Sequence, residues 1–98
     1  MAKTVIWNKT ASRQLDELLT YLHEEVSERA ASRFLEKLYD RLDMLTRYPE
    51  AGRKSQKRKT VRFYRIDKYR QLYYRVHGRN LFVVFIFDTR QHPDKNRY

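Results

Sequence analysis

Four polar residues have the types that phosphoryl chemistry without a metal ion requires. Arg62 and Arg90 each carry a guanidinium that can stabilise negative charge on a phosphate. His92 and Tyr98 carry groups that can move a proton, and both lie in the polar segment that follows an apolar run. These side chains can form one site only if the C-terminal segment folds back over the element that carries Arg62. The hypothesis of a single site therefore depends on this return of the tail, and Arg90 is the residue expected to matter most.

Other kinds of site find less support in the sequence. The chain has no cysteine, which excludes disulfides, thiolate metal ligands and a cysteine nucleophile. His23, His77 and His92 are scattered and have no acidic cluster beside them, so we expect neither a metal site nor a cofactor. A Ser-His-Asp arrangement stays open, although no pattern points to one. Asp88 follows the apolar run and is predicted to form an ion pair that holds the turn.

Positive charge is concentrated in the second half of the chain. The formal net charge is +10 over 98 residues. Residues 1–50 carry eight Lys and Arg against nine Asp and Glu, whereas residues 51–98 carry fourteen against three, a net of +11. A basic protein without a charged partner would spread its cations more evenly. We therefore expect a polyanion or an acidic protein as partner.

Tyrosines accompany the cations and could serve as stacking surfaces for unpaired bases. Six of the eight tyrosines lie at or after Tyr48. Tyrosine is also a good strand former, so any single one can be purely structural. A module that inhibits a partner by covering a surface, without chemistry, fits the same composition. The candidate RNA or ribosome contacts are Arg53, Lys54, Lys57, Arg58, Lys59, Tyr73 and Arg75.

The first half of the chain predicts a short strand and a helical hairpin. Residues 3–7 are rich in β-branched side chains and indicate a strand. Apolar residues then recur at helical spacing from Ala11 to Val26 and again from Ala31 to Leu45. The predicted caps are Asn8 or Thr10 for the first helix and Ser27 for the second, and the "RYPEAG" segment (residues 47–52) ends the hairpin.

The second half predicts three strands after a basic linker, "RKSQKRK", at residues 53–59. Residues 60–66 alternate, with Val61 and Phe63 on one face and Arg62 and Tyr64 on the other. Residues 69–76 alternate as well, and Leu72, Tyr74 and Val76 share a face. Residues 81–87 are apolar on both faces, which is typical of a central strand.

These elements predict one α+β domain over residues 1–98, in the order β-α-α-β-β-β. The helical hairpin covers one face of a largely antiparallel four-stranded sheet. The other face is expected to be basic and aromatic, with Arg62, Tyr64, Tyr73 and Arg75 on it. No signal peptide is recognised, and the longest apolar run is too short to cross a bilayer. We therefore expect a soluble cytoplasmic protein without a membrane partner.

Several segments in this order resemble the RelE/ParE superfamily of toxins from bacterial type II toxin–antitoxin modules. They are the hairpin pattern ending in "YPEAGR", the strand "YRQLYYRV" and the segment "VVFIFDTRQHP". The resemblance implies the same fold and a cognate antitoxin as partner. RelE-like members cut mRNA on the ribosome, whereas ParE-like members poison DNA gyrase without nuclease activity. The first hypothesis is thus mRNA cleavage, with gyrase inhibition or a non-toxic binding module as alternatives.

For RelE-like cleavage the resemblance assigns roles to individual residues. Arg62 would contact phosphate, Arg70 and Arg90 would stabilise the transition state, and Tyr98 or His92 would assist proton transfer. Arg70 departs from the family pattern, because it lies six residues before Val76 instead of five. At strict register it faces the helices. A β-bulge near Gln71 is needed to bring it to the open face.

Overall fold

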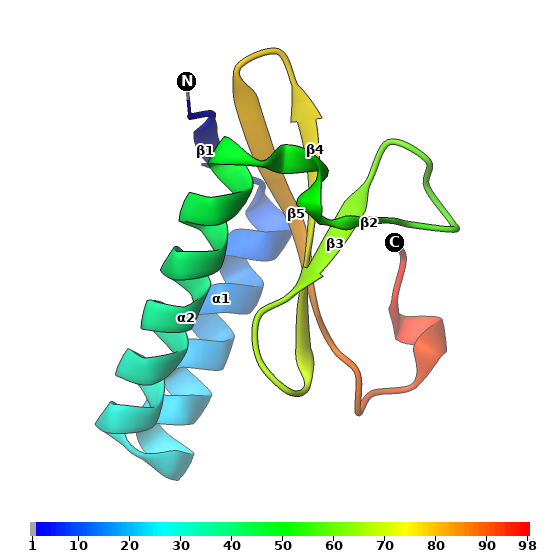
Figure 1. Ribbon diagram of the computed structural model, residues 1–98. Coiled ribbons are helices and arrows are strands. Elements are labelled where there is room, and N and C mark those ends of the chain that lie inside the picture. Colours follow the sequence, from blue (N-terminus) through cyan, green and yellow to red (C-terminus); the bar gives the residue numbers. More distant parts are fainter. Residues whose placement is uncertain (1) are drawn as a thin grey trace.

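Two helices cover one face of a five-stranded sheet in the computed structural model, which describes residues 2–98 (Figure 1). The two helices run side by side, and the C-terminal segment returns along the opposite side of the sheet. The elements are β1 (Thr4–Trp7), α1 (Lys9–Tyr21), a π-helical turn (Leu22–Val26), α2 (Glu28–Arg47), a 3-10 turn (Pro49–Ala51), β2 (Arg53–Lys54), β3 (Arg62–Arg65), β4 (Arg70–His77), β5 (Asn80–Asp88) and a second 3-10 turn (Pro93–Lys95).

The sheet has the strand order β1-β5-β4-β3-β2. β1 and β5 are parallel and all other neighbours are antiparallel. The predicted fold class is confirmed, but the count of four strands is wrong. The fifth strand, β2, lies in the basic linker, where Arg53 pairs with Phe63 and Lys54 with Arg62. β2 has only two residues, and both side chains are cationic and exposed. The sequence therefore shows no alternation of apolar and polar residues that would predict this strand.

Side-chain caps begin both helices at predicted positions. The backbone N–H of Ala11 donates to the Asn8 side chain over 2.8 Å, so Asn8 rather than Thr10 caps α1. The backbone N–H of Ala30 donates to Ser27 over 3.0 Å at the start of α2. Such caps stabilise a helix by about 1 kcal/mol each. The tight connection makes α1 and α2 an antiparallel hairpin, as predicted.

The main core lies between the hairpin and the sheet. Its fully buried side chains include Leu38 and Leu45 of α2 and Leu72 of β4. Each buried aliphatic side chain of this size stabilises the fold by about 1.5–3 kcal/mol. Leu81 and Val83 of β5 contribute from the sheet. This side of the sheet is called the helix face below.

A second cluster covers the opposite side of the sheet, called the tail face below. Val84, Phe85 and Phe87 of β5 are buried there together with Tyr73 of β4. The ring of Tyr98, from the C-terminal tail, packs against this cluster. β5 therefore has buried side chains on both faces and a strand on either side, which confirms the prediction of a central strand.

Tyr74 joins the sheet to the turn that follows α2. Its ring is fully buried, and its hydroxyl donates to the backbone carbonyl of Pro49 over 2.6 Å. The same hydroxyl accepts from the backbone N–H of Gly52 over 3.0 Å. Burial raises the pKa of Tyr74 above its ordinary value, against the lowering effect of the Gly52 hydrogen bond. The hydroxyl thus stays protonated and available as a donor.

We predict that Gly52→Ala destabilises the protein by about 2–3 kcal/mol, as overpacking of a core does. A Cβ at Gly52 would lie 2.3 Å from the Tyr74 hydroxyl oxygen and 2.8 Å from Cε1 of the ring. Urea unfolding measures the change in the free energy of unfolding. Gly78→Asn is the control, because Gly78 has φ +58° with nothing within 4 Å, and asparagine tolerates that conformation. Equal effects of the two changes would contradict the prediction.

Candidate functional site

The residues predicted to form one phosphoryl-transfer site lie in three separate grooves. Arg62 lines a groove beside Glu50 and Tyr74. Arg70 and Arg90 line a different groove between α1 and the end of β5, and Tyr98 lies in a third, on the tail face. The structure therefore brings Arg70 and Arg90 together but separates both from Arg62 and Tyr98.

Arg62 and Tyr64 lie on the helix face, and the prediction that they point away from the helices is wrong. The register decides this, because Phe63 pairs with Tyr73 of the tail face and Tyr64 with Leu72 of the helix face. The guanidinium of Arg62 donates to the backbone carbonyl of Gly52 over 2.8 Å and to that of Glu50 over 3.4 Å. Arg62 therefore holds the turn after α2.

Arg70 also stays on the helix face. The β-bulge lies between Tyr73 and Tyr74, opposite an extra residue of β5, and not near Gln71 as a catalytic position would require. The guanidinium of Arg70 binds the carboxylate of Asp67 over 3.0 Å and lies 5.6 Å from the centre of the Phe34 ring. Its side chain is only 13% exposed. No bulge at Gln71 brings Arg70 to the open face, and Arg70 keeps the orientation toward the helices that strict register gives it.

Arg90 forms a two-point ion pair with Asp88. Its Nε donates to Oδ1 of Asp88 over 3.0 Å and its Nη2 to Oδ2 over 2.6 Å. The backbone N–H of Arg90 donates to the same carboxylate over 2.9 Å. This hydrogen bonding to Arg90 holds the pKa of Asp88 below its ordinary value, against the opposing effect of burial. The predicted ion pair at the end of β5 is confirmed.

The tail returns over the sheet, as the single-site hypothesis required, and of the predicted site residues in it only Tyr98 reaches the tail face. The Tyr98 ring lies 5.3 Å from Phe85 and 6.3 Å from Tyr73 between ring centres, and the guanidinium of Arg58 lies 4.7 Å from the Tyr98 ring. His92 stays outside, with 70% of its side chain exposed. Its Nδ1 accepts the backbone N–H of Asp94, so it caps the last 3-10 turn.

Tyr73 is buried, so its ring does not lie open to solvent as the predicted stacking role would need. Its hydroxyl donates to Gln71 over 3.1 Å and accepts from the Asn96 side chain over 2.8 Å. Burial raises the pKa of Tyr73, and the hydrogen bond from Asn96 only partly opposes this. A tyrosine with a raised pKa stays protonated at neutral pH and is a poor general base.

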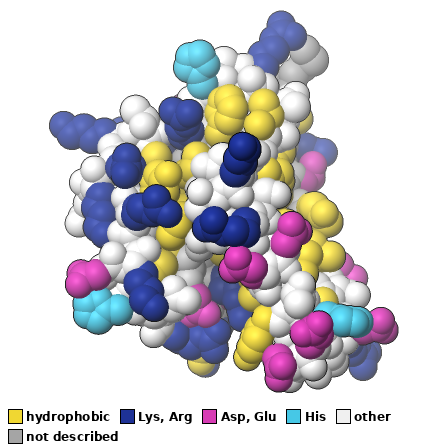
Figure 2. Space-filling model, turned by 180° about the vertical axis from the view of Figure 1, so that it is seen from behind, with side chains coloured by type: hydrophobic (Ala, Val, Ile, Leu, Met, Phe, Trp, Pro, Cys, Tyr) yellow, Lys and Arg dark blue, Asp and Glu magenta, His cyan; other side chains and the backbone are white. Residues whose placement is uncertain are grey.

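The Lys and Arg side chains of the basic linker are exposed, and two of them bind the tail. Lys57 Nζ donates to the carbonyl of Asn96, and Arg58 Nε donates to the carbonyl of Arg97 over 3.0 Å. Figure 2 shows Lys and Arg side chains gathered over the sheet, while Asp and Glu gather near the tip of the helical hairpin. The remaining predicted RNA contacts are exposed as well: Arg53, Lys54, Lys59 and Arg75.

Two clusters were not predicted from the sequence. One places Tyr21 of α1 in the groove that Arg90 lines, while the Arg90 guanidinium lies 4.4 Å from the ring of Tyr69. The other joins cations of α2 with those of β3, which are far apart in the chain. An exposed tyrosine within a polar helix face was the available signal for the first cluster. The second depends on how the hairpin sits on the sheet, which no local pattern reveals.

Comparison with known proteins identifies the family. A family model described as ParE toxin of type II toxin-antitoxin system, parDE, matches residues 5–93. The chain belongs to the ParE toxin family. This makes it a toxin of the type II toxin–antitoxin class, which confirms the family seen in the sequence. A comparison with curated proteins gave no match.

Three solved structures share the fold of this chain. The ParDE toxin–antitoxin system of Pseudomonas aeruginosa matches with a TM-score of 0.73 and 13% identity, over 89% of this chain and 96% of that chain. A YoeB/ParE toxin from Agrobacterium tumefaciens matches with 0.67 and 18%, over 87% and 96%. The RelBE2 toxin–antitoxin complex of Mycobacterium tuberculosis matches with 0.62 and 17%, over 90% and 99%. At these identities the matches show the fold alone.

Two further findings bear on the expected chemistry. Within residues 2–98, no group of three or more His, Cys, Asp or Glu side chains is placed to hold a metal ion. In the same part of the chain, no helix is long and apolar enough to cross a membrane.

We predict that Asp88→Asn destabilises the protein at neutral pH and has little effect in acid. The pKa of Asp88 is lowered in the folded state, so its contribution is present above the unfolded pKa. That contribution is lost as the pH falls through the lower, folded pKa. Thermal unfolding of both proteins from pH 7 down to about pH 2 measures this, and their midpoints should converge toward the acid end. A constant difference would show that the carboxylate charge is unimportant.

Proposed function

We propose that this toxin acts by binding and inhibiting a protein, DNA gyrase, in the bacterial cytoplasm, without cutting RNA. This proposal rests on the separation of the candidate catalytic residues into three grooves. Arg62 lines one, Arg70 and Arg90 line the second, and Tyr98 lines the third. Transition-state stabilisation needs its charged groups already aimed at one reacting phosphate. Membership of the ParE family supports the same target, since ParE-like toxins are the gyrase poisons of the superfamily. The order of the two hypotheses from the sequence is thereby reversed.

The surface between α1 and the end of β5 has the composition of a protein-binding hot spot. Tyr21 is 52% exposed and Tyr69 is 37% exposed, and the half-exposed guanidinium of Arg90 lies 4.4 Å from the Tyr69 ring. Tyrosine and arginine are the residues most enriched among those that dominate binding energy. Asp88 holds the Arg90 side chain in place, so little conformational freedom is lost on binding. We assign the gyrase contact to this surface, called the target surface below.

We also propose that a cognate antitoxin neutralises this toxin. Two of the structures that share its fold are described as toxin–antitoxin systems or complexes. The net charge of +10 is complementary to an acidic, partly disordered segment that orders on binding. Such a segment need not touch the target surface itself, because it can cover the toxin from a neighbouring face.

The test of the proposed target combines expression in bacteria with purified gyrase. We expect early arrest of DNA replication with intact mRNA, and inhibition of supercoiling by the purified toxin. Tyr21→Ala should weaken inhibition by about 30-fold, which corresponds to about 2 kcal/mol for a hot-spot residue. Tyr39→Ala is the matched control, because Tyr39 is also exposed, at 59%, but lies on α2 and outside the target surface. Early cleavage of mRNA within reading frames would reject the proposal.

The second candidate is mRNA cleavage at the ribosome, favoured by one observation. The Tyr98 hydroxyl-bearing ring lies under the Arg58 guanidinium, beside the exposed cations of the linker. Tyr98→Phe keeps the ring packing and removes only the hydroxyl. We expect the variant to retain full toxicity, since gyrase binding does not use that group. Loss of toxicity by 100-fold or so, the scale of a missing proton-transfer group, would support cleavage instead.

A further inference from the structure

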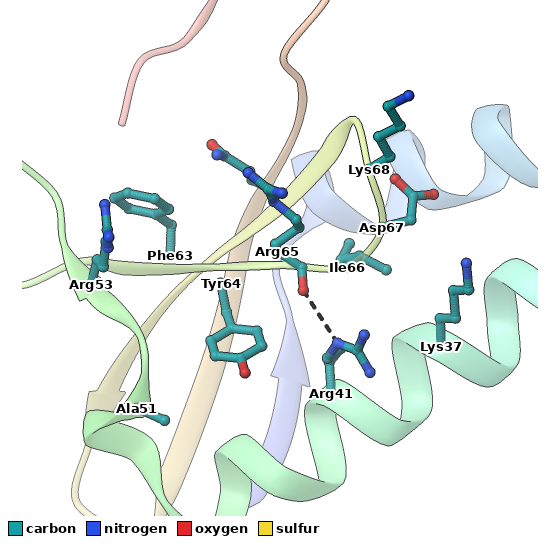
Figure 3. Close-up of a pocket in the computed structure, with 11 residues that line it drawn as sticks. Lys37, Arg41, Ala51, Arg53, Phe63, Tyr64, Arg65, Ile66, Asp67 and Lys68 are labelled. Atoms are coloured by element: carbon teal, nitrogen blue, oxygen red, sulfur yellow. Dashed lines mark hydrogen bonds between the residues drawn. The ribbon is translucent and has the colours of Figure 1, made fainter.

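A groove of about 710 Å³ runs between α2 and the outer edge of the sheet (Figure 3). Cationic side chains reach it from four different elements. Lys37 and Arg41 come from α2, Arg53 from β2, Arg65 from β3 and Lys68 from the turn before β4. Figure 3 shows the α2 cations on one side of β3 and the Arg65 side chain on the other. Cations therefore lie on both sides of the β3 edge that the groove follows.

The positive charge in this groove is not neutralised by the protein. None of its five cations forms a salt bridge within residues 2–98. Asp67 is the one acidic residue that lines the groove, and its carboxylate already binds Arg70 over 3.0 Å. Arg41 Nε donates to the backbone carbonyl of Arg65 over 3.3 Å, which holds that guanidinium across the groove. An anionic ligand is thus matched by preplaced charge.

The shape of the groove suits an extended polymer better than a single small anion. β2 pairs only with Arg62 and Phe63, so the edge of β3 beyond them has no neighbouring strand, and the groove follows that edge. A groove of about 710 Å³ is far larger than one phosphate group needs. The half-buried ring of Phe63 lies on the same side of β3 as Arg53 and Arg65 and can support a stacked base, while the Tyr64 ring lines the groove on the side of α2.

We propose that this groove binds a nucleic-acid strand with unpaired bases, through its phosphodiester backbone. Cations along a groove, with aromatic rings beside them, are the features by which proteins hold single strands without reading sequence. An acidic peptide would need apolar pockets for anchoring side chains as well. The aliphatic residues of the groove are only Ala51 and Ile66, and Ile66 is fully buried. This inference goes beyond gyrase binding and rests on the groove alone.

Fluorescence anisotropy with a labelled single-stranded oligothymidylate of about a dozen nucleotides tests the proposal, and it requires no gyrase. Lys37→Gln combined with Arg65→Gln removes one cation from each side of the β3 edge. We expect about tenfold weaker binding at low salt, and a slope of log affinity against log salt reduced by about 1.4. Lys9→Gln combined with Arg29→Gln is the control, since both residues are exposed and lie outside the groove. It should weaken binding less than about twofold.

Further arms separate this groove from other anion sites. Lys54→Gln combined with Lys59→Gln removes two charges from the basic linker, and a larger loss from this variant than from the groove variant would overturn the proposal. A labelled oligoglutamate of equal charge tests the peptide alternative. If it binds as tightly as the oligonucleotide, with the same dependence on the groove, the proposal also fails. Should the groove variant not fold, as judged by circular dichroism, Lys37→Gln with Lys68→Gln replaces it.

Discussion

The burial of β5 on both faces is the constraint on which the rest of the structure depends. A central strand with large apolar side chains on each face needs two covers, and one helical hairpin supplies only one. The tail face is closed by the return of the C-terminal segment, whose Tyr98 ring packs against Phe85. The extra residue in β5, Val84, places two consecutive side chains, Val84 and Phe85, on that face. Both the path of the tail and the identity of the covered face follow from this strand.

This constraint also explains where prediction from the sequence succeeded and where it failed. Hydrophobic spacing and caps are local, so the helices, Ser27 and the three longer strands of the second half could be predicted, whereas the two-residue strand β2 could not. The alternation in β3 was predicted correctly too, because the side chains of Phe63 and Tyr64 lie on opposite faces of the sheet. Alternation separates two sets of side chains, but it does not say which set meets the helices. Register against β4 decides that, and it sends Arg62 and Tyr64 to the helix face.

The separation of the predicted catalytic residues into different grooves has the same physical origin. Arginines on neighbouring strands were assumed to share one open face, yet that face is filled by aromatic rings and the tail. Arginines that lie elsewhere find local acceptors: backbone carbonyls for Arg62, Asp67 for Arg70 and Asp88 for Arg90. A guanidinium engaged in this way holds turns and strand ends together. Its residue type alone does not distinguish that role from phosphate binding.

The two surfaces proposed for partners meet at a single turn, the segment between β3 and β4. Lys68 lines the basic groove and its ammonium lies 5.4 Å from the ring of Tyr69, which belongs to the target surface. The ion pair between Asp67 and Arg70 crosses the same turn. Asp67 lines the basic groove, whereas Arg70 lines the other groove, between α1 and the end of β5.

A partner that contacts both surfaces must therefore offer protein to the target surface and an anionic strand to the basic groove. An enzyme bound to DNA whose strands are open offers both a protein surface and an anionic strand. The contiguity of the two surfaces thus gives a physical reason for a toxin with so many cations to act on such a complex, because protein contacts and phosphate contacts then add within one binding event.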